Sequence, residues 1–499
     1  MLYIKTVILS AATLLAASCA TAQVVKDYDP AIQRTSAIQY FKPAESHLFT
    51  GDCMPYYHDG TFYIYWLLDE GHHAGLGGLG GHQWALSTSE NLRDWTHYPV
   101  AVGIEEDWEK SICTGSVIAD KGSFYAFYST RVQDDKGVHE QLSYARSDDG
   151  GKTFVKQQPN PFYFPPEECV SRDFRDPKVF KDDAGLYHLF ISGYKKDPVI
   201  EGFGGYLCHL VSEDLKNWKQ VESPLTGQVG TPECSDYFKW NDWYYLLYSI
   251  GGDTYYVMSR QPFGPWQYPP TQSLVEQWAS VYKTAPYKDG RRIAVAYMPC
   301  RSNGKDFDGA IWGGNMLLRE AVQEPDGTLD TRFLEEALPP MHTVALPAFR
   351  TYGDNASASY DSGALSINAS NGTGMAALDG LPVNYRITFE FVPDGNYDEA
   401  GLFVRGDDRQ HRGYKIELNS NKESAFIYNT GINTVKGLDC PVKVDIILKD
   451  EFIDMNIDGR RSIINRLPEK KGDKLYFFLK NGNARFNDIT LREWNGKDW

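Results

Sequence analysis

Residues 59–68 read DGTFYIYWLL, a tight-turn dipeptide followed by an aromatic strand. The same arrangement recurs, and successive copies begin at residues 59, 121, 184, 241 and 289, which gives spacings of 62, 63, 57 and 48 residues. Each copy pairs turn-forming residues with a run rich in aromatic and aliphatic side chains. A period of about 60 residues, with several strands per unit and no helical pattern between copies, is typical of a β-propeller. Five copies predict five blades.

A second element, which ends in a charged turn, follows each copy of the aromatic strand. These elements occupy residues 86–95, 144–154, 210–218, 257–266 and, more weakly, 317–329. The alternative is a large sandwich with accidental similarity between its strands. Regular recurrence of both elements favours the propeller over that alternative.

Beyond the repeats the sequence predicts a second β-domain. Residues 341–355 are rich in proline and small residues, as a linker would be. Residues 356–499 contain at least eight short alternating strands, which predict a β-sandwich. We therefore expect an all-β protein, with a five-bladed propeller at 30–340, a linker at 341–355 and a β-sandwich at 356–499.

The N-terminal residues predict export. Lys5 precedes an apolar run at residues 7–17, which is too short for a membrane helix, and a small-x-small cleavage pattern ends at Ala22. Residues 1–22 are thus predicted to be a signal peptide, which takes the protein to the periplasm, the cell surface or the medium. A second interpretation makes Cys19 the lipidated cysteine of a lipoprotein signal. No later stretch is long and apolar enough to predict a membrane span.

Composition narrows the classes of partner. Among 499 residues, 66 acidic side chains exceed 50 basic ones by 16, which disfavours nucleic acid and anionic lipid. Aromatic residues make up 14% of the chain, and such side chains can stack on sugar rings. The cysteines are widely spaced without a C-x-x-C pair, which argues against a disulfide framework or a zinc site.

Three acidic residues occupy comparable places in their repeats. Asp52, Asp176 and Glu233 precede the first, third and fourth aromatic strands, and each has Gly, Pro or Cys as a neighbour. A propeller gathers its inner strands around one axis, so these side chains can meet in one central pocket. Glycoside hydrolysis needs such a pair of carboxyl groups, one of which has a raised pKa.

Two of these acidic residues lie in motifs that resemble glycoside hydrolase family 32, the β-fructosidase group of invertases, levanases, inulinases and fructan exohydrolases. Residues 174–177 (FRDP) resemble the family's Arg-Asp-Pro motif, and residues 233–238 (ECSDYF) resemble its Glu-Cys-Pro-Asp motif. Weaker agreement extends through residues 83–95, 113–116, 312–320 and 448–464. The resemblance spans nearly the whole mature chain and implies a five-bladed propeller followed by a β-sandwich.

The resemblance also implies roles for the site residues. Asp52 would be the nucleophile, Glu233 the general acid/base, and Asp176 a stabiliser that binds sugar hydroxyls beside Arg175. Configuration at the anomeric carbon would be retained, with the two catalytic carboxyl groups roughly 5–5.5 Å apart. The expected substrate is an oligo- or polysaccharide, and no metal or organic cofactor is expected. Further candidates for sugar contacts are Trp84, Thr114, Trp278 and Trp312.

This chain departs from the family pattern where the terminal sugar is recognised. The family's usual Trp-Met-Asn-Asp-Pro-Asn-Gly is here FTGDCMP at residues 49–55, and its usual Gln falls near Leu67. The loop at residues 71–84 is rich in glycine, and His72-His73 within it suggests a metal. We interpret that loop instead as the rim of a sugar pocket. It is not a phosphate-binding loop, because no Lys-Ser/Thr follows its glycines.

Three functions follow from these observations. The leading hypothesis is an exported retaining glycosidase that cleaves β-fructofuranosidic bonds. A second keeps the propeller but assigns another furanoside, such as arabinofuranose, to the pocket. A third is a carbohydrate-binding surface protein that has lost turnover, although all three carboxylates are retained. The sequence leaves open the linkage preference, endo or exo action, and the oligomeric state.

Overall fold

The computed structural model describes residue 28 and residues 33–352, 356–407 and 413–494. The fold is all-β, as predicted: the one short α-helix of these residues is α1 (Gly75–Gly78), with 3₁₀ turns η1 (Ser171–Asp173), η2 (Lys288–Gly290) and η3 (Glu335–Ala337). No helix of the described ranges has the length and apolar character needed to cross a membrane. The predicted signal peptide and Cys19 lie outside the described residues.

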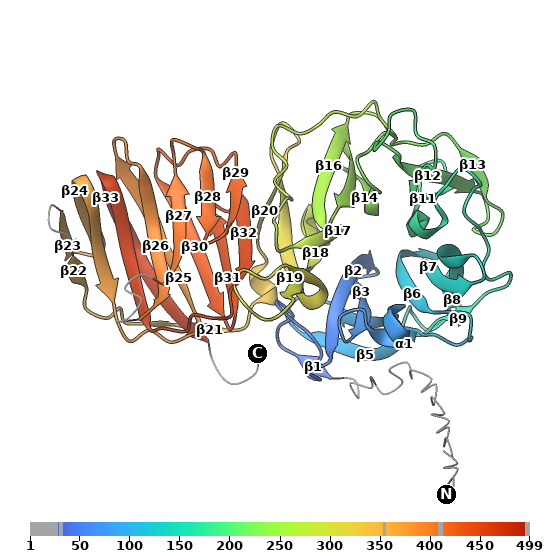
Figure 1. Cartoon of the computed structure of the whole chain (residues 1–499), viewed down its shortest axis with the longest axis horizontal. Helices are drawn as coiled ribbons and strands as arrows, with labels where there is room; N and C mark the ends of the chain where they lie inside the picture. Colours follow the sequence, from blue (N-terminus) through green and yellow to red (C-terminus); the bar gives the residue numbers. More distant parts are fainter. Residues whose placement is uncertain (1–27, 29–32, 353–355, 408–412, 495–499) are drawn as a thin grey trace, which may run out of the picture.

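Five antiparallel blades surround a central axis, and the β-sandwich lies beside them (Figure 1). The first blade contains β2 (Leu48–His58), β3 (Thr61–Glu70), β4 (Gln83–Ser89) and β5 (Trp95–Val102), with β1 (Arg34–Thr35) at its edge, and the second contains β6 (Ser111–Asp120), β7 (Ser123–Asp134), β8 (Gly137–Ser147) and β9 (Val155–Lys156). The third blade contains β10 (Arg175–Lys181), β11 (Tyr187–Tyr194), β12 (Gly205–Ser212) and β13 (Lys219–Val221), and the fourth contains β14 (Glu233–Trp240), β15 (Trp243–Ile250) and β16 (Asp253–Ser259). The fifth blade contains β17 (Ser280–Pro286), β18 (Arg292–Arg301), β19 (Ala310–Gln323) and β20 (Leu329–Phe333).

The aromatic repeat forms the second strand of each blade, β3, β7, β11, β15 and β18. The strand before it is the innermost one, and the five innermost strands β2, β6, β10, β14 and β17 contact one another in a closed ring. The first and last blades also share one sheet, because Thr50 of β2 pairs with Gly314 of β19. Aromatic side chains therefore pack between blades, while the innermost strands are left to line the axis.

All five innermost strands carry a β-bulge at the same place. The register against the second strand shifts after Thr50, Ile112, Arg175, Glu233 and Ser280. A bulge inserts an extra residue and re-aims the side chains beside it. Three of the five bulges contain or adjoin the predicted acidic residues, and Asp176 and Cys234 adopt positive φ angles of 56° and 53° there. The bulges thus turn these side chains toward the axis.

The C-terminal domain is a sandwich whose two layers share the long strands β24 and β33. These two strands pair with each other along both of their halves, which are separated by a bulge between Ala369 and Thr373 of β24. Strands β27 to β29 extend one layer from β26, strands β30 to β32 extend the other from β25, and β21, β22 and β23 pair with β33 or β24. The strands are β21 (Met341–Val344), β22 (Arg350–Tyr352), β23 (Ser357–Asp361), β24 (Ala364–Leu378), β25 (Tyr385–Asp394), β26 (Glu399–Gly406), β27 (Tyr414–Asn419), β28 (Ser424–Ile427), β29 (Thr430–Asn433), β30 (Val442–Lys449), β31 (Phe452–Ile457), β32 (Arg461–Arg466) and β33 (Lys474–Trp494).

The predicted linker, residues 341–355, is partly structured. Its segment β21 pairs with β33, and its segment β22 pairs with β24. Prolines and small residues suggested an extended connection, and extended backbone is also what an edge strand needs. The described residues of the connection between the two domains are therefore hydrogen-bonded to the sandwich as edge strands.

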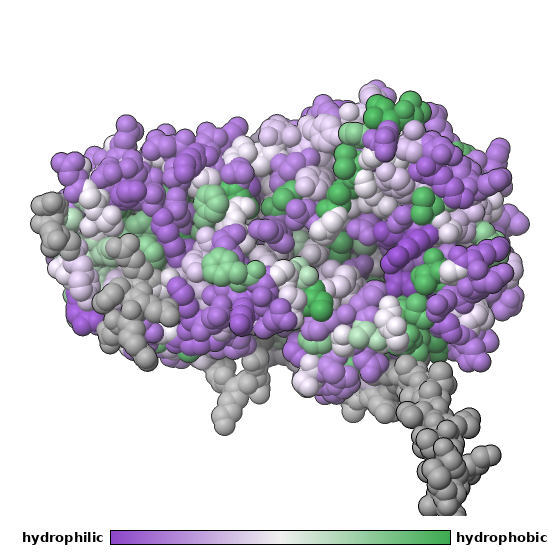
Figure 2. Space-filling view, in the orientation of Figure 1, coloured by the Kyte–Doolittle hydropathy of each residue, from purple (hydrophilic) through white to green (hydrophobic). Residues whose placement is uncertain are grey.

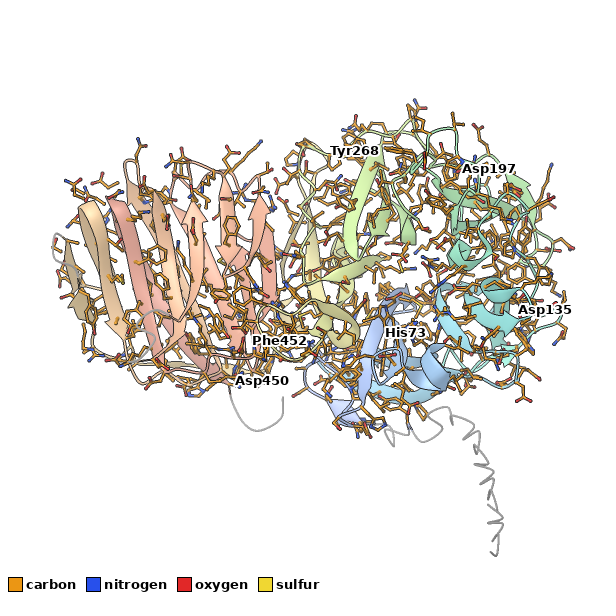
Figure 3. All side chains as sticks on the ribbon, in the orientation of Figure 1. His73, Asp135, Asp197, Tyr268, Asp450 and Phe452 are labelled. Atoms are coloured by element: carbon orange, nitrogen blue, oxygen red, sulfur yellow. The ribbon has the colours of Figure 1, made fainter. Side chains whose placement is uncertain are left out.

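The two domains meet across a buried, partly charged interface. Arg319 of β19 is fully buried and donates hydrogen bonds of 2.7 Å to both carboxylate oxygens of Asp454 in β31. Tyr40 donates to the same carboxylate and belongs to the same apolar cluster as Phe452. Figure 3 shows Phe452 where the sandwich meets the propeller. A buried ion pair leaves an uncompensated charge when one partner is lost, so these contacts fix how the domains are joined.

Candidate active site

A cavity of about 410 Å³ opens at the centre of the propeller, and the three predicted acidic side chains line it together. Hydrophilic residues gather around the middle of the propeller face in Figure 2. Asp52 comes from β2, Asp176 from β10 and Glu233 from β14, so three different blades supply one carboxyl group each. The convergence expected from their positions in the repeats is present.

Asp52 is buried and held on one side. Its Oδ2 accepts a hydrogen bond of 2.5 Å from the Thr114 hydroxyl and lies 3.4 Å from the Cys234 thiol. Its Oδ1 has no hydrogen-bond partner among the described residues. The protein thus positions one oxygen of Asp52, while the other is buried with its hydrogen-bonding capacity unused by the described residues.

Asp176 and Asp52 both contact Cys234, which lies between their carboxyl groups. The backbone N–H of Cys234 donates to Asp176 Oδ2 at 3.1 Å, and the Cys234 thiol lies 3.6 Å from the same oxygen. Cys234 is one of the seven described cysteines, all of them free thiols. Its position between two carboxyl groups was not anticipated from the sequence, although the residue is part of the motif at 233–238.

Glu233 is paired with a guanidinium. Arg175 donates to Glu233 Oε1 at 2.7 Å and to Asp173 Oδ1 at 2.8 Å, and its Nε lies 3.8 Å from Asp176 Oδ2. Arg175 therefore lies between the carboxyl groups of Glu233 and Asp176 and holds them at a defined separation.

Burial raises the pKa of all three acidic groups. That of Asp176 rises to about 7, because desolvation and the charges of Glu233 and Asp52 outweigh Arg175. Desolvation also raises the pKa of Glu233 against the opposing effect of Arg175, and that of Asp52 against its hydrogen bonds from Thr114 and Cys234. The raised pKa values favour retention of a proton within this cluster as the pH approaches neutrality.

The predicted sugar-contact residues divide into two groups. Arg175, Thr114 and Trp312 line the cavity. Trp84 does not: it is fully buried in the first blade and donates to the Cys113 carbonyl at 2.8 Å. Trp278 is also absent from the cavity wall, because it lies at the domain interface and donates to the Thr430 hydroxyl. An indole is amphipathic, and the sequence alone does not show which of these surroundings it occupies.

The cavity also contains residues that the sequence analysis did not name as sugar contacts. Arg131 reaches the cavity from the hairpin of β7 and β8 and pairs with Glu140 at 3.0 Å. His73 and His82 come from the glycine-rich loop, and burial lowers the pKa of each to about 3, so both imidazoles are neutral at physiological pH. The sequence points to His73 within a loop interpreted as the rim of a sugar pocket, whereas only the composition of that loop points to His82. No sequence signal marked the arginine.

Three carboxyl groups from different blades meet in one cavity, which provides the acidic side chains that glycoside hydrolysis requires. Comparison with family models agrees: residues 48–323 match the glycosyl hydrolases family 32 N-terminal domain. The chain belongs to glycosyl hydrolase family 32. The resemblance seen in its motifs is therefore confirmed.

Curated relatives are similar over different lengths. The chain is 24% identical over 489 residues to a levanbiose-producing levanase of Bacillus subtilis, covering 88% of this chain and 87% of that protein. It is 27% identical over 290 residues to the sucrose-6-phosphate hydrolase of Escherichia coli, covering 53% of this chain and 58% of that protein.

Solved structures share the two-domain fold. Fructan 1-exohydrolase IIa of Cichorium intybus superposes with a TM-score of 0.69 at 16% identity, covering 94% of this chain and 98% of that one. An exo-inulinase of Aspergillus awamori gives the same TM-score and identity, covering 94% and 99%. These likenesses confirm a propeller followed by a β-sandwich.

Proposed function

We propose that this protein hydrolyses β-fructofuranosidic bonds in fructans or sucrose-type oligosaccharides with retention of configuration. The observation that carries the proposal is the arrangement of Asp52, which has one oxygen held by Thr114 and the other without a partner among the described residues. The levanase and exohydrolase relatives support fructans as the substrate class.

In the first step an oxygen of Asp52 attacks the anomeric carbon of the fructosyl unit. The bond to the glycosidic oxygen breaks, and that oxygen takes a proton from Glu233, so the leaving sugar departs as an alcohol. The product on the enzyme is a fructosyl ester of Asp52. Glu233 must enter this step protonated, which its burial favours.

In the second step water replaces the aspartate. Glu233, now ionised, accepts a proton from the water as its oxygen bonds to the anomeric carbon, and the ester bond to Asp52 breaks. Free fructose leaves, and both carboxyl groups return to their starting states. Asp176 and Arg175 would bind the hydroxyls of the fructosyl ring throughout.

The second candidate, a glycosidase for another furanoside such as arabinofuranose, keeps the same chemistry. It is favoured by Leu67, an apolar side chain that lines the cavity where the family usually has a glutamine. Loss of an amide there removes hydrogen bonds to sugar hydroxyls and changes which furanoside fits.

One experiment separates these functions. Purified protein would be incubated with levan, inulin, sucrose and arabinan, and released monosaccharides measured by chromatography, with Asp52→Ala as the control. Release of free fructose by the wild type alone supports the proposal. Release of arabinose assigns the second candidate, and glycan binding without release of any sugar refutes hydrolysis.

We further propose that residues 1–22 direct export and are removed. Mass spectrometry of the protein from its native host would then show an N-terminus at Gln23. A diacylglyceryl modification at Cys19 would instead identify a lipoprotein, and retention of residues 1–22 would refute export by cleavage.

A further inference from the structure

Three potential metal ligands, Asp69, His73 and His82, gather beside the catalytic cavity. Asp69 ends the second strand of the first blade, His73 follows in the turn, and His82 immediately precedes β4. One ligand atom from each lies within 4.8 Å of the others, and His82 Nε2 is 3.4 Å from Asp69 Oδ1. Figure 3 shows His73 on the propeller side toward the middle of the ring.

The cluster contains four buried polar atoms without hydrogen-bond partners in the described part of the chain. They are Asp69 Oδ2, His73 Nδ1 and both ring nitrogens of His82. Asp69 is fully buried and His82 is 1% exposed. Unsatisfied buried polar atoms destabilise a fold, so four in one place indicate a group that satisfies them together.

We propose that Asp69, His73 and His82 bind a divalent transition-metal ion of the zinc class. Two imidazoles and one carboxylate are ligands that zinc accepts, whereas calcium and magnesium need sets of about six oxygens. Ligand atoms of a tetrahedral zinc site lie roughly 3.3–3.5 Å apart, because each metal–ligand bond is about 2.0–2.2 Å. The His82–Asp69 separation already has that value.

The surroundings hold the three ligands in place. Trp312 packs against both imidazoles, with ring centroids 5.2 Å from His73 and 4.6 Å from His82. A Cβ at Gly313 would lie 2.6 Å from Asp69 Oδ2, so only glycine fits beside that carboxylate. His73 itself has a φ of +71°, a left-handed conformation in which its N–H donates to Asp69 at 2.8 Å.

Arg131 competes with the ion for His73. Its Nη1 donates to His73 Nε2 at 2.7 Å, which leaves the ring proton on Nδ1. Coordination through Nδ1 moves this proton to Nε2 and breaks that hydrogen bond. Arg131 keeps its bonds to Glu140 and to the Leu79 carbonyl, so the exchange sacrifices one contact of several.

Three protein ligands leave an open coordination position, and His73 and His82 both line the cavity. That position would take an oxygen of the bound sugar or a water. This part of the inference rests on the proposed function, whereas the metal site itself does not.

The test measures zinc binding without any substrate. Tag-free, chelator-treated protein would be titrated with Zn²⁺ by calorimetry, with metal content checked after dialysis. We expect one ion per chain, and affinity more than about 100-fold weaker in Asp69→Asn and His82→Ala, since even outer-shell changes cost 10–100-fold. His58→Ala, at a half-buried histidine outside the cluster, is the matched control and should bind zinc as the wild type does.

Absence of stoichiometric zinc in the wild type, or equal affinity in the ligand variants, overturns the proposal. If a ligand variant does not fold, the visible spectrum of Co²⁺ bound to the wild type decides: intense d–d bands support a four-coordinate site, and their absence refutes it. If the wild-type protein binds zinc but releases no fructose from any of the substrates, the proposed function is refuted and the metal site is not.

Discussion

Gly51 lies against the indole of Trp312 so closely that no side chain fits between them. Gly51 precedes the candidate nucleophile, at a position where the family usually has asparagine. The departure is thus coupled to a second residue, far along the chain, whose ring fills the vacated space and forms part of the cavity wall. The two positions together shape the sugar pocket.

Gly51→Ala is therefore expected to displace the Trp312 indole. Overpacking costs about 1–3 kcal/mol of folding free energy, and displacement of a ring that lines the cavity should lower kcat/KM, measured by steady-state kinetics. In a Trp312→Ala background the same substitution should have a much smaller effect, because the contact is already gone. Gly309→Ala, at a glycine with open space around it, is the control and should leave kcat/KM unchanged. Equal losses in both backgrounds would contradict the coupling.

Thr114→Val should shift the pH dependence of activity. The Thr114 hydroxyl stabilises ionised Asp52, so its removal raises the pKa of that carboxyl. Because the nucleophile must be ionised, the acidic limb of the kcat/KM profile should move to higher pH. A hydrogen bond to a charged group contributes about 1.5–3 kcal/mol, so the acidic limb should move by about one pH unit or more. Thr114→Ser should retain most activity; an unmoved acidic limb in Thr114→Val counts against this role.

The two catalytic roles predict different defects. Asp52→Ala should abolish turnover of every substrate, because no covalent intermediate can form. Glu233→Ala should slow natural oligosaccharides roughly 10²–10⁴-fold, the usual contribution of general acid–base catalysis, but keep much of its first-step rate on an activated aryl glycoside. Azide should rescue the Glu233 variant on the activated substrate. Near-normal activity of Asp52→Ala, or equal slowing of both substrates without rescue, would show the roles to be misassigned.

Asp176 should make the wild type less stable as the pH rises. Its pKa is about 7 in the folded protein, above the roughly 3.9 of an unfolded aspartate. Between these values the folded state binds more protons, so this contribution to stability is present at low pH and is lost as the pH rises toward 7. Denaturant unfolding at pH 5 and pH 8 should show a smaller difference for Asp176→Asn than for the wild type. An unchanged difference would contradict the raised pKa.

Trp278 and Trp312 should separate stability from kinetics. Trp278→Phe leaves the Thr430 hydroxyl at the domain interface without its partner, so the free energy of unfolding should fall by about 1–3 kcal/mol while kcat and KM stay the same. Trp312→Ala should instead alter kcat/KM, because its ring lines the cavity. Chemical denaturation and steady-state kinetics on both variants check this. A kinetic defect in folded Trp278→Phe would contradict this assignment and show that Trp278 contributes to substrate binding or turnover.

Much of the architecture followed from local patterns. The turn and aromatic strand beginning at Asp59 and repeated four times gave the blade count, because each blade must bury a strand of this kind between its neighbours. The acidic residues were found for the same reason: Asp52, Asp176 and Glu233 occupy equivalent positions in a repeated unit, and equivalent positions in a propeller face one axis. Neither inference needs coordinates.

What the sequence determined by itself was therefore the part that repeats: the strands, the order of the blades and the place of each carboxyl group within its blade. Tertiary structure decided what depends on contacts between distant segments. It placed Trp84 in a core and Trp278 at an interface, set Gly51 against Trp312, and joined Asp69 with His82. The physical reason is that side-chain periodicity is local, whereas burial, shared hydrogen bonds and ligand geometry arise only when segments that are separate along the chain pack together.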